Sequence, residues 1–575
     1  MPAKTSIQRD VVVVGAGWTG LISAKTYLDL APDTDLVIVD GGKTVGGVWS
    51  KERIYPDLYA QVSHPLFQYS FEDIPKAGLS KDGYISGYTI NQYLEDFVGK
   101  HGLTSRLQLE TCVVEVTRAE SGAWVLRTDH GPVIECNKLI WAVGPASSPV
   151  LPEWPRSGFS SPVIHSANTG THLDQIAGIK TATVVGGAKS SFDAVYLLLK
   201  QRKKVHWVIR EDGAGPLAMA PPTLLGIWNI VDVISTRILA SFSPSIMNTS
   251  GLWYNTIHQT RLGRVAAGGF WRLVTFLADR AAGYSANEDF ERLRPTPHGS
   301  GVFWARSGLG TASAPDFWKT LHAGDLTVYR TEIESLSHTD VVNLKNGISV
   351  QAGMIISCTG FEKPYRAFSQ SLREELGLSY GKSDAIKWSK LDVAAEKEVV
   401  EALPLLGEYR PLVSPAREGQ GGSNKALLHG PNRHYRRLVP LKLAERDDRS
   451  ICFPGLVHVI FTPTVCEFQA LWTAAYMLGE LDLPGIEERE MEVAKFNAWA
   501  RMRYLDVGRK HSFCIYDYLS YIDTLARDIG VQPARKGNVF TEMFVRYKPA
   551  DYRGMLDEFR SATGVKEANG KHVGR

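Results

Sequence analysis

Runs of apolar residues without polar alternation mark the strands of this sequence, and two of these runs share one pattern. The first, the four valines at 11–14, leads into the small residues GAGWTG and then into an apolar repeat of helical period. A strand without polar alternation is buried on both faces, as in a parallel sheet. A looser copy, TATVVGGAKSSFDAVYLLL, begins at Thr181. The two copies predict an α/β fold with two doubly wound, Rossmann-like dinucleotide-binding domains.

The first glycine turn has the residues that a dinucleotide site needs. Gly15 permits a tight turn, Gly17 lets the backbone approach a pyrophosphate, and Gly20 lets the helix pack closely on the strand. Trp18 opens the helix, whose first N–H groups attract phosphate. The next strand, DLVIVD, ends at Asp40, where a carboxylate suits ribose hydroxyls. This stretch therefore predicts a first nucleotide site.

The second turn, GGAKSS, predicts a second nucleotide site with a different preference. Arg210 follows the strand KVHWVI, and a guanidinium there suits a 2′-phosphate as an acid suits a ribose diol. NADPH is therefore preferred over NADH. Lys189 either reaches a phosphate or faces solvent, and the sequence leaves both open. The residues expected to contact this nucleotide are Gly186, Ala188, Lys189, Ser190, Ser191 and Arg210.

Further motifs resemble those of a known family. They are GGVW at 46–49, WAVG at 141–144, Phe159 with His165, SCTG at 357–360, and CEFQALW at 466–472. In this order they resemble the flavin-containing monooxygenases with their Baeyer–Villiger and N-hydroxylating relatives, and most closely the divergent fungal-type members. The resemblance implies FAD in the first site and NADPH in the second. It adds these expected cofactor contacts: Gly47, Trp49, Val113, Ala142, Gly144, Thr359, Gly360, Glu467 and Gln469.

The resemblance also implies an activity. It implies an NADPH-dependent flavoprotein monooxygenase that inserts one oxygen atom of O2 into an apolar or aromatic small molecule through a flavin hydroperoxide. Hydroxylation or heteroatom oxidation in secondary metabolism is the first expectation. Baeyer–Villiger insertion comes second, because Thr169 stands where that branch carries an aromatic residue. A non-catalytic FAD-binding scaffold is the alternative from another class, and the degenerate second turn is its best support.

Two residues compete for the catalytic position near the flavin. The family's active-site asparagine follows Y-x-x-L, and counting from Tyr55 places Gln61 there, whereas counting back from FED at 71–73 places Ser63 there. Gln61 is preferred because its side chain carries the same amide donor and acceptor as asparagine. Ordinary loop residues at both positions remain the alternative. A helix from about 464 to 483, implied by the resemblance, would direct its N-terminus at the flavin ring.

Domain boundaries follow from the two turns. We expect the FAD-binding domain at 1–160 and 351–575, with the NADPH-binding domain at 161–350 inserted between its parts. A mainly helical insertion at about 213–303 should cover the cleft. Within it, residues 224–242 predict one amphipathic helix. The arginines of 417–437 are expected on a solvent-exposed loop.

Composition and the cysteine pattern further restrict the expected partners, metal sites and location of the protein. The formal charge is +3 with both signs interspersed, so nucleic acid is not an expected partner. The six cysteines include no C-x-x-C, which disfavours a disulfide reductase and a zinc site, and no metal is expected. No signal peptide or transmembrane segment is evident, so a cytoplasmic location is expected, with peripheral membrane contact as the less favoured alternative. The oligomeric state is not readable from the sequence.

Overall fold

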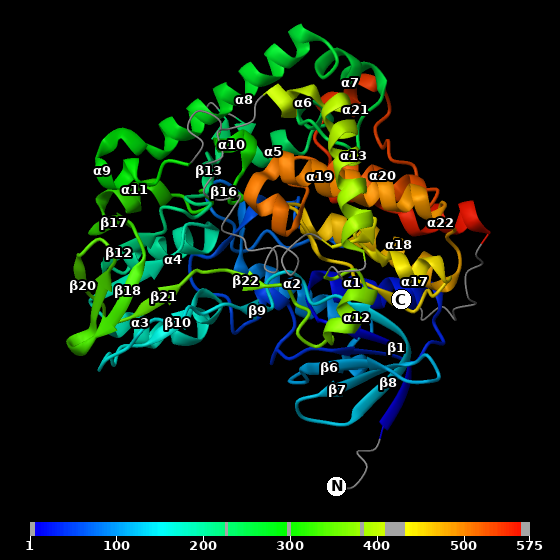
Figure 1. Cartoon of the computed structure of the whole chain (residues 1–575), viewed down its shortest axis with the longest axis horizontal. Helices are drawn as coiled ribbons and strands as arrows, with labels where there is room; N and C mark the ends of the chain where they lie inside the picture. Colours follow the sequence, from blue (N-terminus) through cyan, green and yellow to red (C-terminus); the bar gives the residue numbers. More distant parts are fainter. Residues whose placement is uncertain (1–5, 225–227, 296–300, 380–383, 409–431, 565–575) are drawn as a thin grey trace.

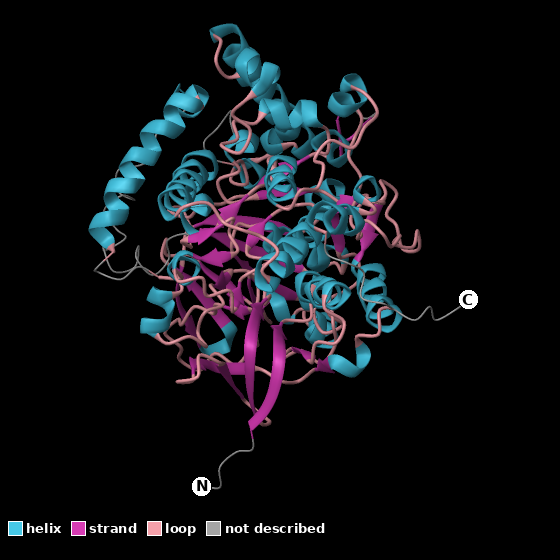
Figure 2. Cartoon of the chain, turned by 90° about the vertical axis from the view of Figure 1, so that its right-hand side faces the viewer, coloured by secondary structure: helices cyan, strands magenta, loops and turns pink. Residues whose placement is uncertain are grey.

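Two β-sheets, a mixed one at the lower centre and a parallel one at the left of Figure 1, form the framework of the fold. The structure is a computed structural model, and it describes residues 6–224, 228–295, 301–379, 384–408 and 432–564. Helices lie above and around the strands (Figure 2).

The first sheet combines strands from both ends of the chain. Its members are β1 (Ser6–Val14), β2 (Leu36–Val39), β5 (Leu107–Gln108), β6 (Val113–Arg118), β7 (Trp124–Thr128), β8 (Val133–Trp141) and β25 (Ile451–Cys452). The order is β5-β2-β1-β8-β7-β6, and β25 pairs with the last part of β8. The strands β5, β2, β1, β8 and β25 are parallel, and β7 and β6 continue as antiparallel strands.

The valines of β1 explain why this strand carries no polar alternation. Val11 and Val13 face the large core beneath α1 (Trp18–Leu30), α2 (Gly87–Lys100) and α18 (Thr462–Leu478). Val12 and Val14 face the core on the other side of the sheet. Since both faces are covered, every position of this half of the strand must be apolar.

The second sheet is parallel throughout. It contains β10 (Val163–His165), β11 (Thr181–Val185), β12 (Lys204–Ile209), β17 (Leu326–Arg330) and β21 (Ile355–Ser357). The order is β10-β21-β11-β12-β17, with α4 (Lys189–Lys200) following β11. A small antiparallel sheet of β18 (Ile333–Ser337), β19 (Val341–Leu344) and β20 (Ser349–Gln351) lies between β17 and β21 in sequence.

Two connections between the sheets run side by side. Residues after β8 form β9 (Ser148–Pro149), and residues after β21 form β22 (Phe361–Glu362). These strands pair antiparallel, with Phe361 opposite Pro149. The N–H of Val150 also donates to the carbonyl of Gly360 at 3.1 Å, a distance typical of a backbone hydrogen bond. The pairing joins the two sheets at one place.

The segment between β12 and β17 is mainly helical and lies at the top of Figure 1. Its α-helices are α5 (Ile230–Ile234), α6 (Arg237–Phe242), α7 (Gly251–Ile257), α8 (Arg261–Ala282), α9 (Glu288–Glu291), α10 (Gly301–Trp304) and α11 (Phe317–Ala323). The short strands β13 (Ala218–Ala220), β14 (Thr223–Leu224), β15 (Trp228–Asn229) and β16 (Leu309–Thr311) flank them.

The prediction of a single helix at 224–242 is wrong. This stretch contains β14, β15, α5 and α6, and residues 225–227 lie outside the described residues. The break comes at Ser235 and Thr236, because the hydroxyl of Thr236 caps a new helix by accepting from the N–H of Leu239 at 3.4 Å. Arg237 does not interrupt an apolar face either, since its guanidinium pairs with Asp523 at 2.5 Å.

The C-terminal part is helical, and two further predictions about it are wrong. Helix α18 ends at Leu478 rather than near 483, because Gly479 adopts φ = +88°. It packs against α1 and α20 (Tyr518–Asp528), while α19 (Ile486–Lys510) packs against α13 (Ala385–Ala402) and α21 (Val539–Phe544) against α6; α22 (Met555–Thr563) is the last helix. Most of the predicted basic loop at 417–437 lies outside the described residues, but Arg433 and Arg437 are buried against Asp392 and Glu492. The expectation of solvent-exposed arginines is therefore wrong for these two.

Within the described residues, no helix is both long and apolar enough to cross a membrane. The same residues contain no cluster of His, Cys, Asp and Glu that could hold a metal ion. All six cysteines are free, and all except Cys112 are buried.

Candidate functional site

The first glycine turn joins β1 to α1 and excludes side chains at two positions. Gly15 has φ = +112°, and a Cβ there would lie 2.5 Å from the carbonyl oxygen of Ala142. A Cβ on Gly20 would lie 1.8 Å from the carbonyl oxygen of Gly15. The helix is therefore pressed onto the turn, and the turn onto the end of β8. Gly17 is the one partly exposed residue in an otherwise buried stretch, so its backbone is what the turn presents outward.

The N-terminus of α1 has the character of an anion site. Gly17 is its N-cap, and among the described residues no side chain caps its first N–H groups. Asp40 supports the turn from below: its carboxylate accepts from the N–H of Ala16 at 2.7 Å and from the N–H of Gly42 at 2.6 Å. Because each carboxylate oxygen has a further lone pair, Asp40 retains capacity for ribose hydroxyls.

Two more glycines continue the turn. The N–H of Gly46 donates to the carbonyl of Ala16 at 2.9 Å, and a short 3-10 helix, η1 (Gly47–Trp49), follows. Gly47 lies opposite Gly17, with a Cβ on Gly17 placed 3.6 Å from the Cα of Gly47. The absence of side chains on both residues lets the two backbones approach each other closely, and both glycines are partly exposed. Trp49 is half-buried beside this pair.

Trp18 lies inside the core rather than in the site. Its ring packs edge-on against Phe67 and Tyr69 and tilts over Tyr93, with centroids 5.0–5.5 Å apart. The hydroxyl of Tyr69 donates to the carbonyl of Trp18 at 2.6 Å. The aromatic cluster fixes the start of α1, so Trp18 can contribute to nucleotide binding only through its backbone N–H.

The remaining expected FAD contacts of the first sheet lie at the same edge as the turn. Ala142 follows β8 directly and is buried, and Gly144 has φ = +68° with open space around its Cα. Val113 begins β6 next to Cys112, whose Cβ lies 3.2 Å from the position of a Cβ on Gly41. The carboxyl ends of β1, β2 and β8 therefore meet where an open α/β sheet binds its ligand.

The second glycine turn repeats the geometry at the end of β11. Gly186 has φ = +130°, and a Cβ there would lie 2.3 Å from the carbonyl oxygen of Cys358. Ala188 is the N-cap of α4, again without a side-chain cap in the described structure, and the hydroxyl of Ser191 donates back to its carbonyl at 2.6 Å. Ala188 and Ser190 are exposed. The turn therefore offers free N–H groups to solvent or to an anion.

Lys189 and Arg210 differ in their surroundings. Lys189 forms an ion pair with Asp193 one turn further along α4, so its side chain already has a protein partner. Arg210 directly follows β12 and is exposed at the carboxyl-end edge of the second sheet, where the second glycine turn also lies. An exposed guanidinium at this edge can adopt the orientation that a ligand phosphate requires.

The linker that leaves the second sheet is held by hydrogen bonds. The hydroxyl of Thr359 donates to the carbonyl of Val150 at 2.5 Å. The Nε2 of His165 donates to the carbonyl of Gly360 at 3.0 Å, and its Nδ1 accepts from the N–H of Ala167 at 3.1 Å. Burial lowers the pKa of His165, which keeps the ring neutral in this arrangement. His165 is thereby a structural residue of the linker.

Gln61 and Ser63 both lie on β3 (Tyr59–Ser63), but their side chains have different surroundings. The Oε1 of Gln61 accepts from the N–H of Thr311 at 3.0 Å, so this side chain contacts the segment that follows the helical insertion. The hydroxyl of Ser63 is buried and has no partner among the described residues. Sequence reasoning missed Thr311, because a backbone donor 250 positions away leaves no signal in the pattern.

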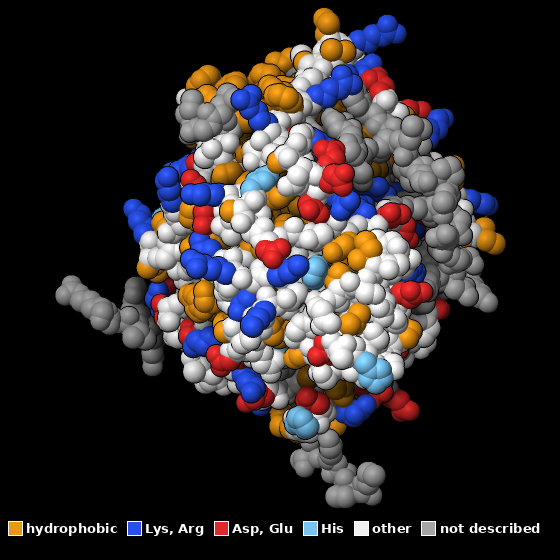
Figure 3. Space-filling view, turned by 90° about the vertical axis from the view of Figure 1, so that its left-hand side faces the viewer, with side chains coloured by type: hydrophobic (Ala, Val, Ile, Leu, Met, Phe, Trp, Pro, Cys, Tyr) orange, Lys and Arg blue, Asp and Glu red, His pale blue; other side chains and the backbone are white. Residues whose placement is uncertain are grey.

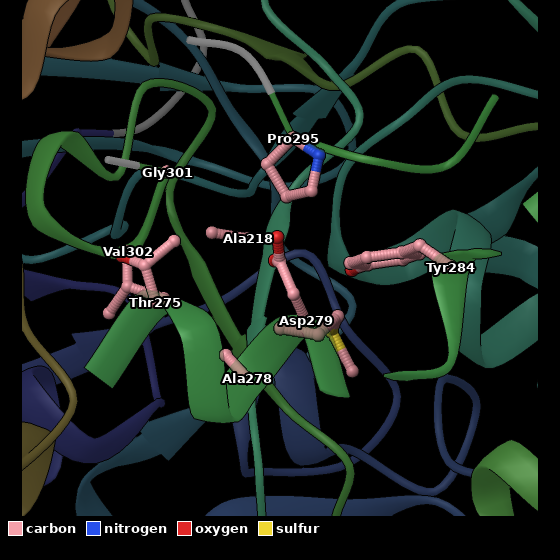
Figure 4. Close-up of a pocket in the computed structure, with 9 residues that line it drawn as sticks. Ala218, Thr275, Ala278, Asp279, Tyr284, Pro295, Gly301 and Val302 are labelled. Carbon is pink, nitrogen blue, oxygen red and sulfur yellow. The ribbon is translucent and has the colours of Figure 1, made fainter. Parts of the chain in front are cut away.

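A small cavity lies on the other side of this segment. Thr275 and Tyr284 line it together with Ala218 of β13, the strand that pairs with β16 (Figure 4). Both hydroxyls are buried and lack a partner within the described part of the chain. Its volume of about 10 Å³ suits a single water molecule. The cavity is therefore too small to be the substrate site.

Glu467 and Gln469 have protein partners in the core. Glu467 accepts from the N–H of Ser70 at 2.8 Å and from the hydroxyl of Ser70 at 2.5 Å, and burial raises its pKa to about 7. Gln469 accepts from the N–H of Gly455 at 2.9 Å and donates to the hydroxyl of Tyr521 at 2.9 Å. Both side chains fix loops beside α1. The prediction that they also contact FAD stays a prediction.

Comparison with known proteins provides close sequence relatives. The family model described as pyridine nucleotide-disulphide oxidoreductase matches residues 12–228. The FAD-dependent monooxygenase DEP4 of Fusarium langsethiae is 53% identical over 554 residues, which make up 96% of this chain and 95% of that protein. The FAD-dependent monooxygenase rstn6 of Aspergillus nomiae is 36% identical, with 97% of this chain and 99% of that protein covered.

Solved structures provide more distant neighbours. The open crystal structure of cyclohexanone monooxygenase has a TM-score of 0.58 at 16% identity, covering 90% of this chain and 97% of that one. Cyclohexanone monooxygenase from Rhodococcus sp. Phi1, bound to NADP+, has a TM-score of 0.58 at 17% identity, covering 91% and 97%. At these identities the likeness shows the fold alone, and it confirms the predicted α/β class with two Rossmann-like sheets.

Proposed function

The chain belongs to the FAD-dependent monooxygenases, and from this premise we propose that it is an NADPH-dependent enzyme that inserts one oxygen atom of O2 into an apolar or aromatic small molecule. Hydroxylation or heteroatom oxidation is the proposed outcome. The observation that carries the proposal is a shared position: the two glycine turns abut the two paired connections between the sheets. Gly15 contacts the start of one connection at Ala142, and Gly186 contacts the start of the other at Cys358.

The first turn fits FAD by its own geometry. Gly15 and Gly20 leave no room for a Cβ, while Gly17 and Gly47 lie close together with both backbones partly exposed. The uncapped N-terminus of α1 suits a pyrophosphate, and Asp40 suits a ribose. Bound FAD supplies the redox chemistry that accepts a hydride equivalent and activates dioxygen, which side chains cannot do by themselves.

The second turn fits NADPH by the same argument. Gly186 excludes a Cβ, Ala188 and Ser190 are exposed, and the first N–H groups of α4 are uncapped in the described structure. Arg210 is the candidate for the 2′-phosphate. Because both turns adjoin the β9–β22 pair, nucleotides held on them approach each other, as hydride transfer requires.

The protein's own residues position the reactants and exclude water. We assign Gln61 to the active site, since its Oε1 is fixed by Thr311 while its amide N–H2 remains a donor. Arg53 supports the junction: its guanidinium donates to the carbonyl of Ala146 at 2.9 Å and lies 5.6 Å from the ring centroid of Phe361. A site enclosed in this way protects a reactive oxygen species from hydrolysis and loss.

The test is anaerobic mixing of the purified flavoprotein with NADPH or NADH, followed by addition of oxygen. The proposal expects flavin bleaching by NADPH at a rate at least about tenfold above that with NADH, because a charge-assisted contact to the 2′-phosphate contributes about 1.5–3 kcal/mol. Absence of bleaching despite full FAD loading would instead support a non-catalytic FAD-binding scaffold. Product analysis with 18O2 then separates hydroxylation or heteroatom oxidation from ester-forming insertion.

A further inference from the structure

The outward side of α8 carries a stripe of apolar side chains, which we call the α8 face. Its members, with their exposed fractions, are Leu262 (85%), Val265 (69%), Leu273 (55%) and Phe276 (59%). Steps of three and four residues through Gly269 place them in one line along the helix. From Arg261 to Arg280 this line is about 28 Å long at 1.5 Å per residue.

The α8 face is not needed to build the fold. The opposite side of the helix already buries Trp271, Val274 and Ala278 in the core. The helix ends are also satisfied, because the hydroxyl of Thr260 accepts from the N–H of Gly263 at 3.0 Å and Gly283 ends the helix in the left-handed conformation. A helix that is apolar on two sides has one side available for a partner.

Most charges along α8 are basic, and the exposed Glu408 beside the helix is already paired with Arg264 at 2.8 Å. Arg261, Arg272 and Arg280 are exposed along the same helix. Residues 233–278 contain no Asp or Glu, although the chain's frequency of 61 acids in 575 residues would give about five there. Asp279, the acid of α8, pairs with Arg294 at 2.8 Å. The α8 face is therefore apolar with a basic border.

Neighbouring helices extend the apolar surface. Leu252 and Trp253 of α7 are exposed beside α8, and α6 links α7 to α21, where Phe540 and Phe544 are exposed. These helices lie together along the upper edge of the molecule in Figure 1. Figure 3 shows hydrophobic side chains gathered at the top of the molecule with Lys and Arg among them.

We propose that the α8 face docks the protein onto an anionic lipid bilayer. An exposed helix at the edge of the molecule can lie in a planar interface, with its apolar stripe among the acyl chains and its arginines at the lipid headgroups. A second copy of this chain is a poorer occupant, because pairing two such faces would bring two arginine borders together, and the acids beside α8, Asp279 and Glu408, are already paired within the chain. The proposal concerns location and is independent of the reaction catalysed.

Vesicle flotation tests the proposal with the full-length holoprotein. Vesicles contain either phosphatidylcholine alone or phosphatidylcholine with about 30% phosphatidylserine, a level that gives the surface the negative potential of a cytoplasmic leaflet. We expect the floated fraction to be at least about tenfold larger with phosphatidylserine at low salt, and to fall several-fold when the salt is raised to about 0.5 M.

Paired variants distinguish docking through the α8 face from nonspecific hydrophobic adsorption to vesicles. Leu262→Ser, Val265→Ser, Leu273→Ser and Phe276→Ser are combined in one protein, and Ile386→Ser with Val393→Ser on α13 form the matched control, since those residues are 71% and 70% exposed. We expect the first set to lower the floated fraction at least about tenfold and the control to leave it within about twofold. A second variant, Arg261→Gln with Arg280→Gln, should remove the phosphatidylserine dependence while the apolar stripe stays intact.

The outcomes separate the alternatives. Absence of wild-type flotation with either vesicle, or equal flotation of wild type and the four-serine protein, overturns the proposal. A wild-type dimer in light scattering that the four serines convert to a monomer would assign the face to a second copy instead. If the four-serine protein does not load FAD, the arginine variant decides alone: unchanged flotation overturns the proposal, and loss of the phosphatidylserine dependence supports it.

Discussion

The Oε1 of Gln61 accepts a hydrogen bond of 3.0 Å from the backbone N–H of Thr311. The bond joins β3, a hairpin strand close to the first glycine turn, to β16, which follows the helical insertion and pairs with β13. One side chain thus holds together two segments that are 250 positions apart. Its loss should affect both the position of the insertion and the shape of the site.

Gln61→Ala should damage turnover more than stability. The substitution leaves the N–H of Thr311 without its acceptor, at a cost of about 1–3 kcal/mol in the free energy of unfolding. Misplacement of the active-site segment should lower product formed per NADPH consumed by about tenfold or more. Measured coupling and urea unfolding check this, with Gln61→Glu retaining the acceptor and Gln92→Ala, an exposed glutamine on α2, as control. Coupling unchanged in Gln61→Ala would exclude the assigned role.

Ser63→Ala separates the two catalytic candidates. The Ser63 hydroxyl is buried without a partner in the described structure, so its removal should leave stability unchanged or raise it by up to about 1 kcal/mol. Because we assign the site to Gln61, turnover should stay within about twofold. A large fall in the rate of product formation, with normal folding, would transfer the role to Ser63.

Gly20→Ala should prevent FAD binding. The new Cβ would lie 1.8 Å from the carbonyl oxygen of Gly15, so α1 must move away from the turn. We expect purified protein with little bound flavin, and destabilisation of several kcal/mol on the scale of overpacked cores. Gly99→Ala on α2 is the matched control, since open space surrounds that Cα and alanine favours a helix by about 1 kcal/mol. Normal flavin content in Gly20→Ala would contradict the geometry of the turn.

Arg210→Ala should change the choice of nucleotide without changing the fold. A charge-assisted contact to a 2′-phosphate contributes about 1.5–3 kcal/mol, so the KM for NADPH should rise about tenfold or more. The KM for NADH should stay nearly constant, because NADH lacks that phosphate. Steady-state kinetics with both nucleotides measure the ratio, and Arg127→Ala on the exposed side of β7 serves as control. Equal effects on both nucleotides would contradict the assignment of Arg210.

Glu467 should make stability depend on pH. Burial raises its folded-state pKa from 4.5 to about 7, so its contribution is fully present below pH 4.5 and is lost as pH rises through 7. The difference corresponds to about 3 kcal/mol. Glu467→Gln cannot ionise; its Oε1 can accept from the N–H of Ser70 while its Nε2 donates to the Ser70 hydroxyl, so relative to wild type it should gain about this amount between pH 4.5 and pH 8. Urea unfolding at the two pH values measures the change, and a constant difference between the proteins would contradict it.

The sequence predicted the fold class and the family well because both depend on local patterns. The valines of β1, the glycine turns and the acid at Asp40 form local strand, turn and helix signals, and the comparisons confirm the class that they imply. The helix expected at 224–242 failed for the opposite reason. Its apolar content is real, but Thr236 caps a second helix and Arg237 finds acidic partners about 300 positions away.

Contacts made over long sequence distances limited the prediction of the site. The partner of Gln61 is a backbone N–H, and the partner of Glu467 is Ser70, which is 397 positions away. Trp18 sits within a motif that suggests a ligand contact, yet its ring belongs to an aromatic core. Such relations depend on tertiary packing, which residue types and spacing do not encode locally.

The pairing of β25 with β8 bears on how the protein is made. Ile451 lies beside Leu139, so a strand next to the first glycine turn receives this neighbour only after about 310 further residues have been synthesised. The ribosome adds about 5–20 residues each second, which leaves that sheet edge unpaired for roughly 15–60 s. During this interval the second sheet can already fold, since all of its strands lie between 163 and 357. We therefore expect the NADPH-side sheet to mature first and flavin to be acquired only after Ile451 and Cys452 have been synthesised.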